Sequence, residues 1–227
     1  MDSSLIDHNY DNDHDKQFEA AIAKKLKVVC VGDSITEGSG ASNYPSFLRS
    51  RLDPGAIEVV NLGRGGRTMM KEGDFPYWKE EAYAEALDSR ADVIVLLLGT
   101  NDSKKHNWDE EQYERDYVEM VQQFQNMESS PTIWLVIPPP LHVDGAMEMQ
   151  QEVINHHIPR KIRKIAETCS IPEHQIIDLF ETMGGKGLFN PNYFLLDGCH
   201  PNSLGYFIMA ETIAEALCLP IEPVAEV

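Results

Sequence analysis

The stretch Leu26-Lys27-Val28-Val29-Cys30-Val31-Gly32-Asp33-Ser34 decides the fold, because it joins a short apolar run to a polar turn. The run Leu26–Val31 is rich in β-branched residues and predicts a buried strand. Ser34 then lies on a strand-to-helix turn, where the next helix offers free backbone amides. A serine in this position serves either as a nucleophile or as the N-cap of the helix.

The same pattern recurs along the chain. Further predicted strands are Ile57–Val60, Val93–Leu98, Ile133–Ile137 and Ile176–Leu179, and helical patterns cover residues 43–52, 78–88, 109–128, 147–169 and 203–217. This alternation predicts a three-layer α/β/α fold with a five-stranded, doubly wound parallel sheet. No linker or internal repeat interrupts it, so we expect a single domain over residues 26–227. Ligands of such folds bind beyond the carboxyl ends of the strands.

Composition excludes several classes of protein. The 227 residues carry 19 Lys and Arg against 37 Asp and Glu, a net charge of −18, which disfavours nucleic acid and anionic membranes as partners. No apolar run approaches the roughly 18 residues of a membrane span. The four cysteines lack paired spacing, so we expect reduced thiols, and the N-terminus lacks the features of a signal peptide. We therefore expect a cytoplasmic protein.

Residues 1–25 form an acidic N-terminal segment that we interpret as a mobile tail. The first 20 residues contain six acids and one lysine, and bury too little to offset their ordering entropy. The run Asp11-Asn12-Asp13-His14-Asp15 lacks the glycine and the distal glutamate of a calcium loop. The sequence therefore predicts no metal site.

Polar residues follow the second and third predicted strands. The glycine-rich run Asn61–Thr68 fails the dinucleotide-binding pattern, because Thr68 occupies the position of the last glycine. Its glycines either let backbone N–H groups approach a ligand or simply form a tight turn. Asn101 follows Val93–Leu98, where its amide either donates to a developing negative charge or caps a turn.

The run Asp197-Gly198-Cys199-His200 precedes the last helical pattern. A carboxylate three residues before an imidazole can accept its Nδ1–H, which leaves Nε2 free to take a proton from Ser34. The alternative is an unrelated Asp and His in one loop. Together with Ser34 and Asn101, the pair predicts a serine hydrolase whose reacting groups share one edge of the sheet.

The chain resembles the SGNH hydrolases of the GDSL type over about residues 26–217. The resemblance lies in four sequence blocks that occur in the order of that family: Gly32-Asp33-Ser34, Asn61–Thr68, Gly99-Thr100-Asn101-Asp102 and Asp197-Gly198-Cys199-His200. The resemblance implies a flavodoxin-like sheet and no cofactor. It makes Ser34 the nucleophile, His200 the general base and Asp197 its orienting partner. It also implies an oxyanion hole formed by the N–H groups of Ser34 and Gly66 and by the Asn101 amide. Two positions depart from the family pattern: Ile35 replaces a leucine, and Gly65 replaces a common serine.

The loops after the second and third blocks, residues 71–78 and 104–108, resemble those of carbohydrate and sialate O-acetylesterases. We therefore expect a serine esterase that removes short acyl groups, acetyl above all, from carbohydrate hydroxyls. The candidate substrate contacts are Asp33, Tyr77, Trp78 and Trp108, with ordinary packing as the alternative for the aromatic residues. The alternative predictions are a short-chain lipase, lysophospholipase or thioesterase of the same family, a non-catalytic carbohydrate-binding relative, and a flavodoxin-like mononucleotide binder.

Overall fold

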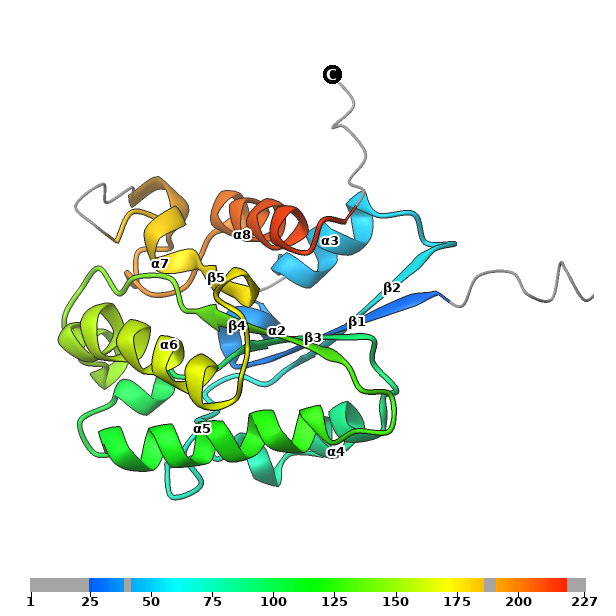
Figure 1. The fold of residues 1–227 in the computed structure, drawn as a ribbon. Helices are drawn as coiled ribbons and strands as arrows, with labels where there is room; N and C mark the ends of the chain where they lie inside the picture. The colour runs from blue at the N-terminus through cyan, green and yellow to red at the C-terminus, as the bar shows by residue number, and fades with distance from the viewer. Residues whose placement is uncertain (1–24, 39–41, 186–190, 220–227) are drawn as a thin grey trace, which may run out of the picture.

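A computed structural model describes residues 25–38, 42–185 and 191–219 (Figure 1). Its sheet contains β1 (Leu26–Gly32), β2 (Ile57–Gly63), β3 (Val93–Leu97), β4 (Thr132–Ile137) and β5 (Ile176–Asp178). The strands pair in parallel in the order β2-β1-β3-β4-β5. This confirms the predicted doubly wound sheet. The predicted mobile tail lies almost entirely outside the described residues and stays a prediction.

Helices cover both faces of the sheet, as Figure 1 shows. One face carries α4 (Glu81–Asp88), α5 (Glu110–Gln125) and α6 (Ile158–Thr168), and the other carries α3 (Tyr44–Arg51), α7 (Leu179–Thr182) and α8 (Ser203–Ala216). Successive strand residues point to opposite faces, so Val29 and Val31 pack in one core and Val28 and Cys30 in the other. Burial of both faces explains why the strands are almost continuously apolar.

The helix predicted over residues 147–169 is wrong in its first part. Residues Ala146–Glu148 form a 3-10 turn in which Met147 and Glu148 adopt positive φ angles of 49° and 67°. This left-handed backbone cannot continue an α-helix. A π-helical segment, Val153–His157, then precedes α6. The short helix α2 (Ser34–Glu37) was not predicted, since four residues are too few to show helical periodicity.

The topology places the turn after β1 beside the turn after β3. From β1 the chain moves outward to β2 and then returns to β3 on the other side of β1. At such a switch point the carboxyl ends of the two central strands border a crevice. Ser34 begins α2 directly after β1, and Asn101 begins a 3-10 turn, Asn101–Ser103, shortly after β3. Among the described residues, no helix has the length and apolar character needed to cross a membrane.

Candidate active site

Three side chains from opposite ends of the chain form a hydrogen-bonded series. Ser34 Oγ lies 2.8 Å from His200 Nε2, and His200 Nδ1 lies 2.8 Å from Asp197 Oδ2. The other carboxylate oxygen of Asp197 accepts the backbone N–H groups of Cys199 and His200, both at 2.9 Å. These two bonds fix the carboxylate relative to the loop, so that it orients the imidazole toward Ser34.

The surroundings of Asp197 keep its carboxyl group ionised. Partial burial by itself would raise its pKa, but the N–H of Cys199 and the bonds from His200 outweigh that effect and lower the pKa below its ordinary value. An ionised Asp197 accepts the Nδ1–H of the neutral imidazole. Nε2 then carries a lone pair and accepts the hydroxyl proton of Ser34, which is the arrangement that a general base requires.

Asp33 holds the start of α2. Its Oδ1 accepts the N–H of Ile35 at 2.9 Å, and its Oδ2 lies 3.3 Å from Asn101 Nδ2. The side chain is fully buried, and burial raises its pKa to about 6 although the Ile35 N–H opposes the shift. This burial favours a structural role for Asp33 over its predicted substrate contact. The side chain connects the turn after β1 to the turn after β3.

The glycine-rich loop after β2 lies beside Ser34. Gly66 has φ +78°, a conformation that side-chain-bearing residues rarely adopt, and the space next to its α-carbon is open. Among the described residues its N–H has no acceptor. The N–H of Gly65 is already bound to Glu37 Oε2 at 2.8 Å. A β-carbon built on Gly65 would lie 3.8 Å from Ser34 Cβ, which places this loop next to the serine.

Asn101 lies between the glycine-rich loop and Asp33. Its Nδ2 is 3.1 Å from the carbonyl oxygen of Arg67, and its own carbonyl accepts Asn107 Nδ2 at 3.1 Å. Because Nδ2 also approaches Asp33, an oxyanion would share this amide with two protein acceptors. The structure thus brings Ser34, Gly65, Asn101 and His200 to one edge of the sheet.

Asp102 joins the same two loops. Its carboxylate oxygens accept the N–H groups of Met69 and Met70 at 2.9 and 2.7 Å. Complete burial raises its pKa to about 7; the two N–H groups oppose that shift and the nearby Asp33 adds to it. No role for Asp102 follows from the sequence, since nothing there indicates which backbone groups a buried carboxylate will meet.

The three predicted aromatic contacts lie in or against the core. Tyr77 is fully buried, and its hydroxyl donates to the Leu62 carbonyl at 2.6 Å, which favours core packing over its predicted substrate contact. Trp78 donates its Nε1–H to the Met69 carbonyl at 2.6 Å and is half-buried against the core. Trp108 packs against Tyr113 with ring centroids 5.4 Å apart. The packing alternative accounts for all three rings.

Phe75 is the aromatic residue that sequence reasoning missed. Its side chain is 56% exposed, and the Arg67 guanidinium lies 5.7 Å from its ring centroid. The backbone beneath it is fixed, because its carbonyl accepts the Thr68 N–H at 2.9 Å and its N–H donates to Asp74 Oδ1 at 3.0 Å. Phe75 belongs to the same loop as Tyr77 and Trp78, but only the folded structure distinguishes the exposed ring from the buried ones.

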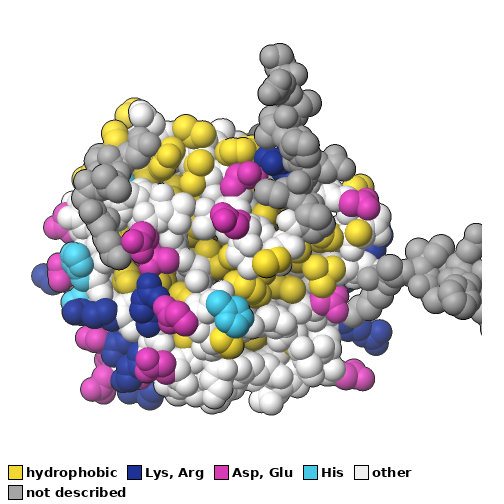
Figure 2. Space-filling view, turned by 45° about the horizontal axis from the view of Figure 1, so that its top comes forward, with side chains coloured by type: hydrophobic (Ala, Val, Ile, Leu, Met, Phe, Trp, Pro, Cys, Tyr) yellow, Lys and Arg dark blue, Asp and Glu magenta, His cyan; other side chains and the backbone are white. Residues whose placement is uncertain are grey.

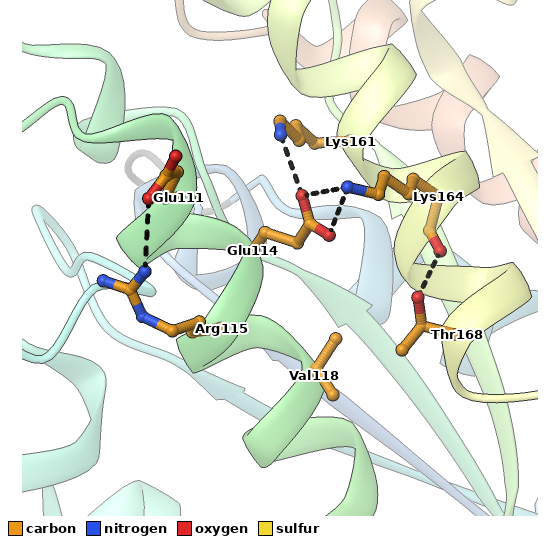
Figure 3. A pocket seen from close by; sticks show the side chains of 7 residues that line it. All are labelled: Glu111, Glu114, Arg115, Val118, Lys161, Lys164 and Thr168. Atoms are coloured by element: carbon orange, nitrogen blue, oxygen red, sulfur yellow. Dashed lines mark hydrogen bonds and ion pairs between the residues drawn. The ribbon is translucent and has the colours of Figure 1, made fainter.

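A hollow of about 540 Å³ lies away from this site, between α5 and α6 (Figure 3). Glu114 projects between Lys161 and Lys164, at 2.8 and 2.7 Å from their ammonium groups, and Glu110 lies 3.1 Å from Lys161, so two carboxylates balance the two cations. Figure 2 likewise shows basic and acidic side chains intermingled at this edge of the molecule. Within the described part of the chain, no three His, Cys, Asp or Glu side chains are grouped to hold a metal ion.

A parallel α/β sheet with a Ser–His–Asp series at its switch point is the arrangement of a serine hydrolase. A sequence model of the GDSL-like lipase/acylhydrolase family matches residues 30–208, and the chain belongs to that family. This confirms the membership that the four blocks predicted.

Individual relatives agree with this assignment. The chain is 32% identical over 225 residues to an acetylxylan esterase of Xylanibacter ruminicola; the match covers 89% of this chain and 45% of that protein, so the chain spans about half the length of this relative. Among solved structures, the fold resembles Est24, a carbohydrate acetylesterase from Sinorhizobium meliloti, with a TM-score of 0.67, 16% identity and coverage of 86% of this chain and 99% of that one. It also resembles Axe2, an acetylxylan esterase from Geobacillus stearothermophilus, with a TM-score of 0.62, 21% identity and coverage of 86% and 95%.

Proposed function

We propose that this protein is a serine esterase that hydrolyses acetyl esters on carbohydrate hydroxyls. The observation that carries the proposal is the series Ser34–His200–Asp197, with 2.8 Å between both pairs of reacting atoms. Membership of the GDSL-like family supports ester hydrolysis. The 32% identity to an acetylxylan esterase supports acetyl as the acyl group and a carbohydrate as the alcohol.

In the first half of the reaction, Ser34 Oγ attacks the ester carbonyl carbon while His200 Nε2 takes the hydroxyl proton. The carbonyl oxygen becomes an oxyanion, which accepts hydrogen bonds from the N–H groups of Ser34 and Gly66 and from Asn101 Nδ2. Collapse of this intermediate breaks the bond to the sugar oxygen. The imidazolium of His200 protonates that oxygen, the sugar leaves, and the acetyl group stays on Ser34.

In the second half, water replaces the sugar. His200 accepts a proton from the water as its oxygen attacks the acetyl carbonyl, and the same oxyanion donors stabilise the second intermediate. His200 then returns the proton to Ser34 Oγ, and acetate leaves. Asp197 remains ionised throughout and stabilises the imidazolium in both halves, in keeping with its lowered pKa.

The exposed ring of Phe75 supplies the sugar contact that the buried aromatic residues cannot. Arg67 backs one face of the ring and itself bonds to the glycine-rich loop beside Ser34, so Phe75 belongs to the border of the site. A fixed backbone lowers the entropic cost of presenting such a platform. Phe75 thus offers an apolar face for a sugar ring that neighbours the acetylated position.

A second candidate function is hydrolysis of longer acyl esters. The loop that carries the acid and the base also exposes Leu195 and Leu196, and Val143 is half-exposed where it borders Gly198. An apolar border of this kind suits an acyl chain longer than acetyl. Chain-length preference therefore separates the two candidates.

The test is a series of p-nitrophenyl esters from acetate to palmitate, followed by acetylated xylo-oligosaccharides, with release of acetate as the readout. We expect kcat/KM to fall steadily beyond acetate, and acetate to be released from the oligosaccharides. A maximum at medium or long chains would replace the first function by the second. Absence of turnover on every ester by folded protein would favour a non-catalytic relative.

A further inference from the structure

Arg67 contacts two parts of the proposed oxyanion hole, the Gly65–Gly66 peptide and the side-chain amide of Asn101. Its Nη1 donates to the carbonyl oxygen of Gly65 at 2.6 Å, and its own carbonyl oxygen accepts Asn101 Nδ2 at 3.1 Å. The Gly65 carbonyl and the Gly66 N–H belong to the same peptide group. The guanidinium therefore binds one end of the peptide whose other end, the Gly66 N–H, is the proposed oxyanion donor.

The guanidinium is itself held on two further sides. Its Nε lies 2.8 Å from Glu80 Oε1, and both side chains are more than two-thirds buried. The ring of Phe75 lies across the guanidinium at 5.7 Å. The planar fork of arginine satisfies Glu80 through Nε and Gly65 through Nη1 at the same time, a geometry that lysine cannot reproduce. Glu37 fixes the preceding peptide through the Gly65 N–H.

We propose that Arg67 is a positioning residue that orients and polarises the Gly65–Gly66 peptide for the oxyanion. This inference rests on the proposed function, because it presumes that Gly66 N–H donates in the transition state. A charged donor on a carbonyl strengthens the hydrogen bond that the N–H of the same peptide makes. It also prevents rotation of a peptide between two glycines, which otherwise have wide conformational freedom. The gain falls on the transition state, since the ground-state carbonyl is a weaker acceptor.

The main test is Arg67→Met, which keeps the length and apolar packing of the side chain but removes its donors. We expect kcat to fall about 10- to 100-fold with KM within about threefold. The fall should be smaller than that for complete loss of an oxyanion donor, about 10²- to 10³-fold. Arg67→Lys keeps the charge without the fork, so its kcat should lie between wild type and Arg67→Met.

Arg51 provides a matched control. It pairs with Glu211 at 2.9 Å and lies 5.6 Å from the ring of Phe207, so it makes the same two kinds of contact as Arg67 with Glu80 and Phe75. It bonds to neither Gly65 nor Asn101. Arg51→Met should therefore change stability by a similar amount and leave kcat within about twofold of wild type.

Two readouts distinguish positioning from a merely structural role. Active-site titration with a phosphonate gives kcat per intact site, and inhibition by a trifluoromethyl ketone reports binding of an oxyanion-like adduct on Ser34. If Arg67 positions the hole, the inhibition constant should rise in proportion to the fall in kcat/KM. A reduced number of titrated sites with unchanged kcat per site would overturn the inference.

If Arg67→Met does not fold, Glu80→Gln tests the positioning role of Arg67. This substitution weakens the ion pair between Glu80 and Arg67 and leaves Arg67 in place. We expect about a three- to tenfold loss of kcat per titrated site, and an unchanged value would overturn the inference. Failure of the proposed function is visible separately. Wild-type activity in folded Ser34→Ala would refute the acyl-enzyme mechanism itself. An inactive Ser34→Ala together with a fully active Arg67→Met would refute only the role of Arg67.

Discussion

Replacement of Asp197 by asparagine separates catalytic orientation from loop stability. One oxygen of the Asp197 carboxylate accepts two backbone N–H groups and the other accepts His200 Nδ1–H. In Asp197→Asn the amide oxygen must face the two N–H donors, since an NH₂ group there would oppose them. The amide NH₂ then faces His200 Nδ1, which can only accept its hydrogen, so the ring proton moves to Nε2.

A proton on Nε2 prevents His200 from accepting the hydroxyl proton of Ser34. We therefore expect kcat to fall about 10³- to 10⁴-fold at neutral pH, which corresponds to about 4–5.5 kcal/mol of activation free energy. The loop keeps both backbone hydrogen bonds, so the free energy of unfolding should change by less than about 1 kcal/mol. Asp197→Ala instead leaves the two backbone N–H groups without their acceptor, so it should lose about 1–3 kcal/mol of stability in addition to activity.

The assay measures kcat on p-nitrophenyl acetate and the thermal unfolding midpoint on the same preparations. Asp109→Asn is the matched control, because one oxygen of Asp109 also accepts two backbone N–H groups, those of Glu111 and Gln112, without contact to His200. It should keep full activity. A stable Asp197→Asn enzyme with kcat within tenfold of wild type would refute the orienting role of Asp197.

Other substitutions test the remaining parts of the site. Ser34→Ala should lower kcat at least about 10³-fold without unfolding the protein, and retention of most activity would contradict the acyl-enzyme. Asn101→Ala should cost about 10²- to 10³-fold in kcat with little change in KM, whereas a lower melting point with normal kcat would make it a turn residue only. Phe75→Ala should reduce kcat/KM on acetylated oligosaccharides and not on ethyl acetate; equal losses would exclude a sugar platform. Asp102 has a raised pKa of about 7, so its stabilising contribution is complete below about pH 4 and is lost as the pH rises through 7. The gap in melting temperature between wild type and Asp102→Asn should therefore narrow over that range, and a constant gap would contradict the shift.

The fold was largely predictable because its main determinants are local in sequence. Each strand is a short apolar run that ends at a polar turn, and each is followed by a helical pattern, so the order of elements follows directly. The failure of the predicted helix at residues 147–150 has the opposite origin. Met147 and Glu148 adopt left-handed backbone although neither residue favours it, so a tertiary constraint overrides the local preference.

The hydrogen-bonded series of Ser34, His200 and Asp197 was predictable for a similar reason. Asp197 and His200 are three positions apart, and their partner Ser34 follows a strand whose place in the sheet the alternation implies. What the sequence could not provide is the set of contacts around them. In the sequence, nothing distinguishes Arg67 from other cations that follow a glycine, or Tyr77 from other aromatic residues in a loop.

The difference lies in what each interaction depends on. Strand order and turn position bring Ser34 and Asn101 together whatever the surrounding side chains are, since the carboxyl ends of β1 and β3 are neighbours. Whether Arg67 reaches Gly65 depends on the path of the loop, which Asp102 sets from a different segment through Met69 and Met70. A buried carboxylate with a raised pKa is costly unless it holds something in place. Here Asp102 holds the loop that presents Gly66, so the cost of its burial is offset where the proposed chemistry needs a fixed N–H.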